Sequence, residues 1–488
     1  MQLHPTTADQ PHDVRSFAMT SAGTVRIEAH NLAEFSRIRA SDAIGVGGGT
    51  LFVSVGEYDV AENFSGDRLE KVIYTTKAGA PMVPTAEQFG AYNDDSLLFN
   101  FIPVYDHAGE IDLIISSVTS DICSSGEMGE LECIVRQFDH EHAAPMAEVL
   151  DHEFSKHPGS VVSQYFYSIA DQAEADRTAV AALPLMTGSV NSILTNESRA
   201  LALYAPRDPC DPSVTENGTN LWVKLDQFYD RQDALKGSTG YRSRNSAFAV
   251  GSDVCVRDNQ TRLGVMVGFT EADITSHGNI VNHSAEVRQY QVGVYGDHHV
   301  TENQDVDFSL GYARGLVEGK RHLYRLNKHA NSSYQSDLVY AGVGYNWRGD
   351  VVSPFVRFDY TYLRSAGYHE WGATVFNYDV KAQTRHSGLV QVGYQFKVQP
   401  AKALTLEGRV ALGAEVLDKE NRIQAAFEGI PGAYFTTRSA EDSRLMGLFD
   451  LGLNYQATDA LSMRLKYHLA YQPDFRSHGG EVEVKYTF

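Results

Sequence analysis

The residues "GGEVEVKYTF" (479–488) alternate between two kinds of side chain. The apolar or aromatic members are Val482, Val484, Tyr486 and Phe488, and polar residues stand between them. Because successive side chains of a β-strand point to opposite faces, this pattern predicts a strand with one apolar and one polar face. The rest of the chain must show whether the apolar face meets a protein core or a membrane.

The same alternation recurs from residue 221 onwards, for example in "LGVMVGF" (263–269), "VQVGYQF" (390–396) and "LSMRLKYHLAY" (461–471). It persists over strands of about ten residues, which is the length that a tilted membrane strand needs. The polar face carries full charges and glycines in nearly every strand. A polar lumen allows this, so the pattern favours a transmembrane β-barrel over a soluble β-sandwich.

The joins between these strands alternate between short and long. Short joins are expected at 257–260, 347–353 and 456–460, and long polar joins at 230–244, 275–286, 318–334 and 418–442. Short turns on one side and long loops on the other are typical of outer-membrane barrels. We count about twelve strands, an even number as such barrels require.

Charge and hydropathy exclude two other classes of protein. The net charge is −21, which argues against nucleic acid as a partner, because phosphate binding needs a basic face. The sequence has no run of about eighteen apolar residues, so a transmembrane helix is excluded, whereas a barrel of alternating strands is not.

The 488-residue length suggests two or more parts, and the region before residue 221 differs from the rest. Residues 1–120 contain short alternating stretches and predict β-strands. Residues 134–205 are rich in alanine and have helical spacing. The helices are expected at 144–157, 161–186 and 189–205. The first residues, "MQLHPTTADQPHDV", lack the basic and apolar regions of a signal peptide. We therefore expect either a cytosolic protein or the C-terminal piece of a longer chain.

Taken in order, these motifs resemble the bacterial autotransporter (type V secretion) family. "LWVKLDQFYDRQ" (221–232) resembles the first barrel strand of the family, and "EVKYTF" (483–488) resembles its C-terminal signature. Upstream, "NLAEFSRIRASDAIGVGGGTLFVSV" (31–55) and "DSLLFNFIPVYDHAGEIDLIIS" (95–116) resemble the last rungs and cap of a right-handed β-helix passenger. The helical region resembles the connector that leads to a helix in the barrel pore.

The resemblance implies an all-β fold with three parts. Residues 1–120 would be the end of the passenger, 121–218 the helical connector and pore helix, and 219–488 a twelve-stranded antiparallel outer-membrane barrel. The implied function is to anchor and export a passenger to the cell surface, without enzymatic activity, cofactor or metal. The implied partners are outer-membrane lipid, the barrel assembly machinery and periplasmic chaperones, and the barrel would be monomeric.

The resemblance also assigns roles to particular residues. Val482, Val484, Tyr486 and Phe488 would form the C-terminal insertion signal, and their strand would pair with the strand near Leu221 to close the sheet. Charges on the polar face would point to the pore helix or to water. These are Arg357, Asp359, Glu407, Arg409, Asp450, Arg464 and Lys466. The pore helix offers Asn191, Ser192, Asn196, Glu197 and Arg199 as partners.

The four cysteines acquire a geometric prediction from the same topology. Cys210 would follow the pore helix at the periplasmic mouth, near Cys255 at the end of the second barrel strand, so these two could form a disulfide. Cys123 and Cys133 bracket a short loop that a second bridge could close. The alternative is four free thiols.

Three further motifs offer candidate sites. Arg348, Gly349 and Asp350 spell an integrin-type tripeptide, but they fall in a short periplasmic join. His140, His142 and His152 lie among acidic residues without the spacing of a known zinc motif, and a solvated acidic linker is expected instead. Asn191 and Asn196 are separated, so they do not match the asparagine pair beside which some autotransporters cut themselves. No nucleophile elbow, zinc-protease motif or P-loop occurs.

Two other functions remain open at this point. One is a porin-like channel to which residues 1–205 are appended. The other is a carrier for an exported hydrolase whose catalytic part lies upstream of Met1. An adhesin-like passenger is favoured over a hydrolase because the recognisable rungs are those of a β-helix.

Overall fold

The structure is a computed structural model of the 488-residue chain. It divides into two compact units, residues 1–183 with 427–435 and residues 184–426 with 436–488. Each unit is described by itself. The described residues are 3–4, 10–30, 33–54, 68–94, 99–117, 130–157, 160–167, 169, 172–184, 186–203, 210, 219–234, 240–256, 260–278, 283–323, 326–417, 422–438 and 444–488.

Short strands form the first part of the N-terminal unit. They are β1 (His12–Val14), β2 (Phe17–Ala18), β3 (Thr24–Glu28), β4 (Ile38–Ala40), β5 (Ile44–Gly45), β6 (Thr50–Ser54), β7 (Arg68–Thr75), β8 (Ala91–Asp94), β9 (Phe99–Val104) and β10 (Glu110–Ser117), with the 3-10 turn η1 (Thr85–Glu87). β3, β6 and β8 pair in parallel, as do β1, β4 and β7. β10 then pairs antiparallel with both β7 and β9. Parallel stacking is the pairing that the rungs of a β-helix require.

The apolar side chains of these strands point into a core. Val25 and Ile27 of β3 are fully buried, and their register partners Leu51 and Val53 of β6 are buried as well. Between them, the Arg26 guanidinium lies over the Phe52 ring at 4.6 Å from its centroid. Each of these strands therefore contributes alternate residues to one interior, as period-2 alternation predicts.

Five helices follow: α1 (Glu130–Gln137), α2 (Ala144–Lys156), α3 (Val161–Tyr167), α4 (Gln172–Ala182) and α5 (Met186–Leu203). The prediction of one helix over 161–186 was wrong, because α3 ends at Tyr167 and α4 begins at Gln172. The Ile169 side chain between them is completely buried. The first four helices belong to the N-terminal unit and α5 to the other one. None of the described helices is both long and apolar enough to cross a membrane.

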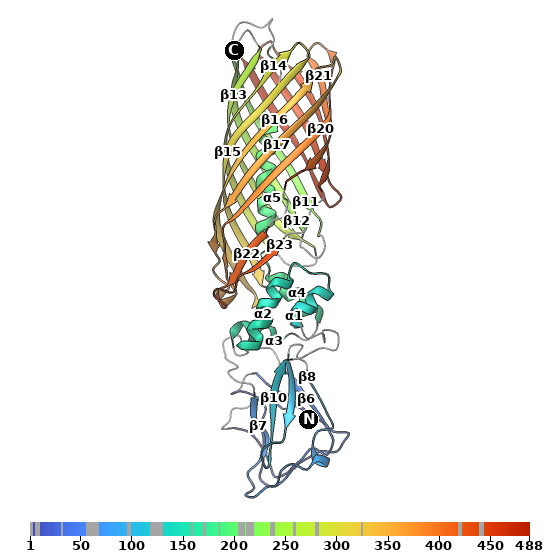
Figure 1. Cartoon of the computed structure of the whole chain (residues 1–488), viewed down its shortest axis with the longest axis vertical. Coiled ribbons are helices and arrows are strands. Elements are labelled where there is room, and N and C mark those ends of the chain that lie inside the picture. Colours follow the sequence, from blue (N-terminus) through green and yellow to red (C-terminus); the bar gives the residue numbers. More distant parts are fainter. Residues whose placement is uncertain are drawn as a thin grey trace. The chain divides into compact units, whose positions relative to one another are not determined.

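The second unit contains a closed antiparallel barrel (Figure 1). Its twelve strands are β11 (Thr219–Gln232), β12 (Gly240–Val256), β13 (Thr261–His277), β14 (Ser284–Thr301), β15 (Gln304–Leu323), β16 (Lys328–Trp347), β17 (Val352–Ser365), β20 (Gln383–Ala401), β21 (Leu404–Glu415), β24 (Leu445–Gln456), β25 (Leu461–Tyr471) and β26 (Phe475–Thr487). The strand count predicted from the sequence is confirmed.

The two faces of each barrel strand differ sharply. On β11, Trp222 faces inward and is 1% exposed, whereas Leu225 faces outward and is 57% exposed. The alternation continues around the wall, so that aliphatic and aromatic side chains cover the outside and polar ones the inside. Inward glycines make room for the large interior rings: a Cβ on Gly251 would lie 2.3 Å from the Trp222 ring.

The predicted long joins at 230–244, 275–286 and 318–334 were too long, because strands extend into each of them from both sides. The 318–334 segment is mostly strand, because β15 runs to Leu323 and β16 begins at Lys328. Polar side chains at these strand ends had suggested a loop, but the cross-strand backbone hydrogen bonds continue past the apolar band. The join after β21 contains β22 (Arg422–Phe427) and β23 (Phe435–Arg438). With β18 (Tyr368–His369) and β19 (Tyr378–Val380), which flank the 3-10 turn η3 (Thr374–Phe376), they form a four-stranded sheet.

Candidate functional site in the barrel lumen

Helix α5 lies inside the ring of barrel strands (Figure 1). Its apolar side fits closely against the wall. Val190, Ile193 and Leu194 are buried, and Gly315 of β15 leaves the space that Leu194 fills, since a Cβ at Gly315 would lie 2.8 Å from Leu194 Cδ2. The wall is therefore shaped to accept the helix.

Polar side chains of α5 bond to the wall along its length. The Asn191 amide donates to Gln383 at 3.3 Å and accepts from the Ser365 hydroxyl at 2.8 Å. At the next residue of α5, the Ser192 hydroxyl accepts from Arg385 at 2.9 Å. These contacts fix the N-terminal half of the helix to β17 and β20.

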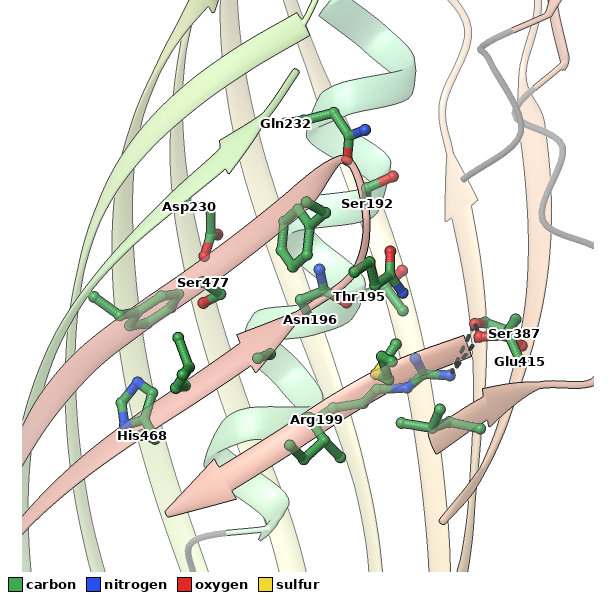
Figure 2. A pocket seen from close by; sticks show the side chains of 18 of the residues that line it. Ser192, Thr195, Asn196, Arg199, Asp230, Gln232, Ser387, Glu415, His468 and Ser477 are labelled. Atoms are coloured by element: carbon green, nitrogen blue, oxygen red, sulfur yellow. Dashed lines mark hydrogen bonds and ion pairs between the residues drawn. The ribbon is translucent and has the colours of Figure 1, made fainter. Parts of the chain in front are cut away.

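The central anchor of α5 is Arg199. Its guanidinium donates to the Ser387 hydroxyl at 2.8 Å and lies 3.6 Å from the Glu415 carboxylate (Figure 2). Ser387 in turn donates to Glu415 at 2.6 Å. Buried charges are stable only when paired and hydrogen-bonded, and this three-residue network meets that condition. Arg199 was among the expected helix residues, whereas its partners Ser387 and Glu415 were missed. Their inward position in the strand alternation is the signal that could have found them.

A cavity of about 150 Å³ remains between α5 and one side of the wall (Figure 2). The helix contributes Ser192, Thr195, Asn196 and Arg199 to it. The wall contributes mostly polar groups, among them Asp230, Arg385, Asp450 and His468. The helix thus occupies the lumen without filling it, and both polar and apolar side chains line the remaining space.

The seven charges predicted to face the lumen all lie on the inner face of their strands. Arg357 is 2% exposed and bonds to Asp307, to the Ser309 hydroxyl at 3.1 Å and to Asp359 at 2.8 Å. Arg409 donates to Gln391, and Asp450 lines the cavity. These residues pair chiefly with other strands of the wall, and none of their bonds named here reaches α5.

The remaining predicted charges gather at the seam where β26 meets β11. Arg464 lies 2.8 Å from Glu407 and 3.3 Å from Glu483, and Lys466 lies 3.2 Å from Glu481. Lys224 of β11 completes the cluster at 3.4 Å from Glu481 and 3.7 Å from Glu483. The seam is thus closed on the inside by a network of buried ion pairs.

The outer side of the same seam carries the four residues of the expected insertion signal. Val482, Val484, Tyr486 and Phe488 all point outward and are 37–69% exposed. Val484 lies opposite Val223 in the ladder, and the Phe488 amide donates to the Thr219 carbonyl at 2.9 Å. The strand closes the sheet, which leaves no unpaired edge.

The structure joins Cys210 to Cys255, the pair expected beside the end of β12, with their Cα atoms 5.8 Å apart. This bridge ties the segment after α5 to the wall. Cys133 lies on α1, and Cys123 falls outside the described residues. The second predicted pair therefore stays a prediction.

The other sequence motifs have structural roles. Arg348 of the Arg-Gly-Asp tripeptide is bound by Asp305. The expectation of a solvated linker around His140 was wrong, because α2 buries Met146 and Leu150 in a helical core and His140 bonds Asp176 at 2.5 Å. Asn191 and Asn196 lie on α5, the first bound to the wall and the second beside the cavity.

Among the described residues, one cluster has the spacing of metal ligands. It comprises Asp106, His107 and Asp112. Arg68 already occupies it, donating to Asp106 at 2.8 Å and to Asp112 at 2.9 Å. The contact with Arg68 lowers the pKa of the Asp106 carboxyl below its usual value. The guanidinium of Arg68 therefore already occupies carboxylate oxygens that a metal ion would need.

Comparison with known proteins agrees with this architecture. The autotransporter beta-domain family model matches residues 221–468. The translocator domain of the autotransporter NalP from Neisseria meningitidis is 12% identical with a TM-score of 0.50, over 62% of this chain and 98% of that one. The beta domain of the Bordetella autotransporter BrkA is 14% identical, with a TM-score of 0.40 and coverage of 55% and 99%. The transport unit of AIDA-I from Escherichia coli is 13% identical, with a TM-score of 0.40 and coverage of 61% and 98%. No curated protein matches the chain in sequence.

The family match spans just over half of the chain, from strand β11 into strand β25. The closed sheet of twelve strands and the helix within it form the architecture of a translocator, which is a transport module of the outer membrane. The chain belongs to the autotransporter family.

Proposed function

We propose that the barrel anchors the chain in the outer membrane and exports the N-terminal unit to the cell surface as a passenger. The observation that carries the proposal is the bonding of α5 to the inner wall through Asn191, Ser192 and Arg199. Helix α5 is held in the lumen by buried polar bonds, and in the chain it connects the N-terminal unit to the first barrel strand.

Ion conductance separates this function from that of a porin-like channel. The full chain in planar bilayers is expected to pass little current, because α5 occupies the lumen. Deletion of residues 186–203 should raise the conductance several-fold. A control variant, Arg39→Ala, breaks an exposed ion pair with Asp13 in the N-terminal unit and should leave the conductance unchanged. A full chain that conducts as well as the deletion variant would favour the channel.

The partners of the barrel are part of the same proposal. Outer-membrane lipid would contact the outward side chains, and periplasmic chaperones would deliver the chain to the barrel assembly machinery. A closed sheet offers no edge for a second copy, which supports a monomer. Deletion of Phe488 should reduce the yield of assembled barrel while the N-terminal unit still folds. Equal yields of assembled barrel from both chains would contradict its role as an insertion signal.

The passenger is proposed to be adhesin-like and without enzymatic activity. The support is the stack of parallel strands β3, β6 and β8, since repeated rungs present an extended surface for binding. Cells that display the chain should therefore bind to surfaces or to other cells more than cells without it. Hydrolysis of ester or peptide substrates that depends on the displayed chain would favour a hydrolase passenger.

A further inference from the structure

Arginines on the outer wall of the barrel fall into two groups. Seven of the described barrel-strand residues are outward-facing arginines: Arg231, Arg242, Arg244, Arg288, Arg314, Arg364 and Arg476. Strand register gives the residue directly opposite each one on the neighbouring strand. Such directly opposed pairs are close enough for their charges to stabilise or destabilise the sheet.

Four of the seven lie opposite a carboxylate. Arg244 lies opposite Asp273, and Arg288 lies opposite Glu271, with 3.5 Å between the charged groups of the second pair. Arg314 and Arg364 flank Asp337 on its two sides, and Arg314 is 2.8 Å from it. The sheet thus places three carboxylates opposite these four arginines.

The other three lie opposite one another. Arg231 of β11 is in register with Arg242 on one side and with Arg476 on the other. The neutral residues Thr275 and Tyr471 continue the row on either side. We call Arg476, Arg231 and Arg242 the arginine row. Like charges directly opposite each other destabilise a sheet, so an anion bound to the arginine row would stabilise it.

Nearby protein groups supply part of that negative charge. Asp233 lies 2.8 Å from Arg231 and 3.5 Å from Arg476, and Arg242 is 3.4 Å from the His277 ring. One carboxylate thus contacts two of the three guanidiniums, and the third contacts a histidine ring. The side chains of Arg231 and Arg476 remain 44% and 54% exposed, so their outer sides are accessible to a ligand.

The row lies where the apolar outer surface of β11 ends. Leu221, Val223 and Leu225 precede it on the same outward face. Tyr229, two residues before Arg231, and Tyr471, beside Arg476, are outward aromatics of the kind that mark the membrane interface. The guanidiniums are therefore at the depth of lipid headgroups, with apolar surface for acyl chains directly adjacent.

The geometry points to a binding site for a lipid with a phosphorylated headgroup, held by the arginine row at the outer end of the barrel seam. Guanidinium groups bind phosphate oxygens in pairs and retain their charge at the interface. Adjacent strands are about 4.8 Å apart, so the three arginines span roughly 10 Å, which is enough for more than one phosphate. This inference rests on the proposed placement of the barrel in the outer membrane.

Lipid retention tests the site with a matched control. The full chain and two triple variants are reconstituted in phosphatidylcholine bilayers that contain diphosphorylated lipid A, and retained lipid is counted by native mass spectrometry after transfer to detergent. One variant is R231Q/R242Q/R476Q. The control is R288Q/R314Q/R364Q, which removes the same charge from arginines that lie opposite carboxylates. The row variant should lose about tenfold in retention relative to wild type, and the control should stay near wild type.

Three results would overturn the inference: equal retention by wild type and row variant, equal loss in both variants, or equal retention of dephosphorylated lipid A. Displacement of the lipid by millimolar inorganic phosphate would also overturn it, since the row would then be a site for free anions. The single variant Arg231→Gln removes the central guanidinium and serves where the triple variant does not fold. Heat-modified gel mobility reports folding separately, and conductance tests the proposed function, so the two failures are distinguishable.

Discussion

Strands β3 and β13 have the same alternating pattern, but their apolar faces point in opposite directions, inward in β3 and outward in β13. In β3, Val25 and Ile27 are fully buried and the charged residues face outward. In β13, Leu263, Val265 and Val267 are 45–59% exposed. The side chains between the apolar ones differ accordingly. Between its apolar residues β3 has Arg26, whereas β13 has glycine and methionine at the corresponding positions. The alternation predicts a strand with two different faces. The residues between the apolar ones then indicate which face points to the interior.

Glycine on the inner face of β13 shows why. Gly264 lies under the Tyr295 ring, where a Cβ would be 2.3 Å from the ring. Tyr295 also accepts from the Trp222 indole at 2.6 Å and donates to Asp253 at 2.8 Å. Large rings with polar handles can fill a narrow lumen only where the opposing strand carries no side chain. Gly264 therefore makes room for a large ring with a polar handle on the inside of this barrel.

The largest effect is expected from the inner face of the seam. Lys224→Met removes one of the three cations of the seam cluster, so that Arg464 and Lys466 alone must balance Glu407 and the buried Glu481 and Glu483. Breaking a buried pair in this way costs about 3–5 kcal/mol, and urea unfolding in lipid should show that loss. Lys224→Arg keeps the charge and should lose far less. A methionine variant as stable as wild type would mean that the seam does not depend on its ion pairs.

The next largest destabilisation is expected from the apolar core of the N-terminal unit. Ile27→Ala should destabilise that unit by about 2–5 kcal/mol, because a fully buried side chain is replaced by a cavity. Thermal unfolding followed by circular dichroism measures the loss. Arg26→Ala, at the neighbouring outward position, is the control and should have a smaller effect. If the two variants unfold alike, the assignment of inside and outside in β3 is wrong.

The apolar face of the barrel should respond to charge according to its depth. Val265→Arg places a cation on the lipid face and should cost about 2–4 kcal/mol near the middle of the bilayer. Thr261→Arg, at the end of the same strand, should cost about 0–1 kcal/mol. Refolding yields in lipid vesicles compare the two. Equal tolerance of both variants would show that β13 does not face the membrane interior.

The smallest effect is a pH dependence in the helices of the N-terminal unit. Burial, with the neighbouring Asp151 charge, raises the pKa of Glu130 to about 8. Burial raises the pKa of Asp151 to about 6, despite the hydrogen bonds that it accepts from the Leu131 and Glu132 amides. When the pKa of a carboxyl is higher in the folded state than in the unfolded state, the folded state becomes less stable as pH rises.

The melting temperature of these helices should therefore fall between about pH 5 and pH 8, and Glu130→Gln should remove most of that dependence. Glu148, on the exposed side of α2, provides the matched glutamine control. A melting temperature that rises over the same range would contradict the assignment.

Much of the barrel could be predicted from the sequence because the alternation along each strand distinguishes its apolar face from its polar face. The inward position of residues such as Arg357 follows from parity along one strand, and the strand count follows from the number of alternating segments. The closure of β26 onto β11 was implied by the family resemblance. Strand ends are different. Polar residues such as Glu318 and Lys320 lie beyond the apolar band, where backbone pairing rather than side-chain type keeps the strand intact.

The partners of α5 could not be predicted in the same way. Arg199 is evident as a polar helix residue, but its bond to Ser387 and Glu415 depends on how the helix is rotated and placed within the wall. That placement is set by shape, for example by Leu194 against Gly315. The arginine row likewise depends on register between strands that are far apart in sequence, since Arg231 and Arg476 are brought together by barrel closure.

Protease treatment of intact cells tests the central claim most directly. In cells that assemble the chain in the outer membrane, added trypsin should degrade the N-terminal unit, residues 1–183, and leave a protected fragment that contains β11 to β26. Cells whose outer membrane has been permeabilised should give the same fragment. An N-terminal unit that becomes sensitive only after permeabilisation would place it in the periplasm and contradict export to the cell surface.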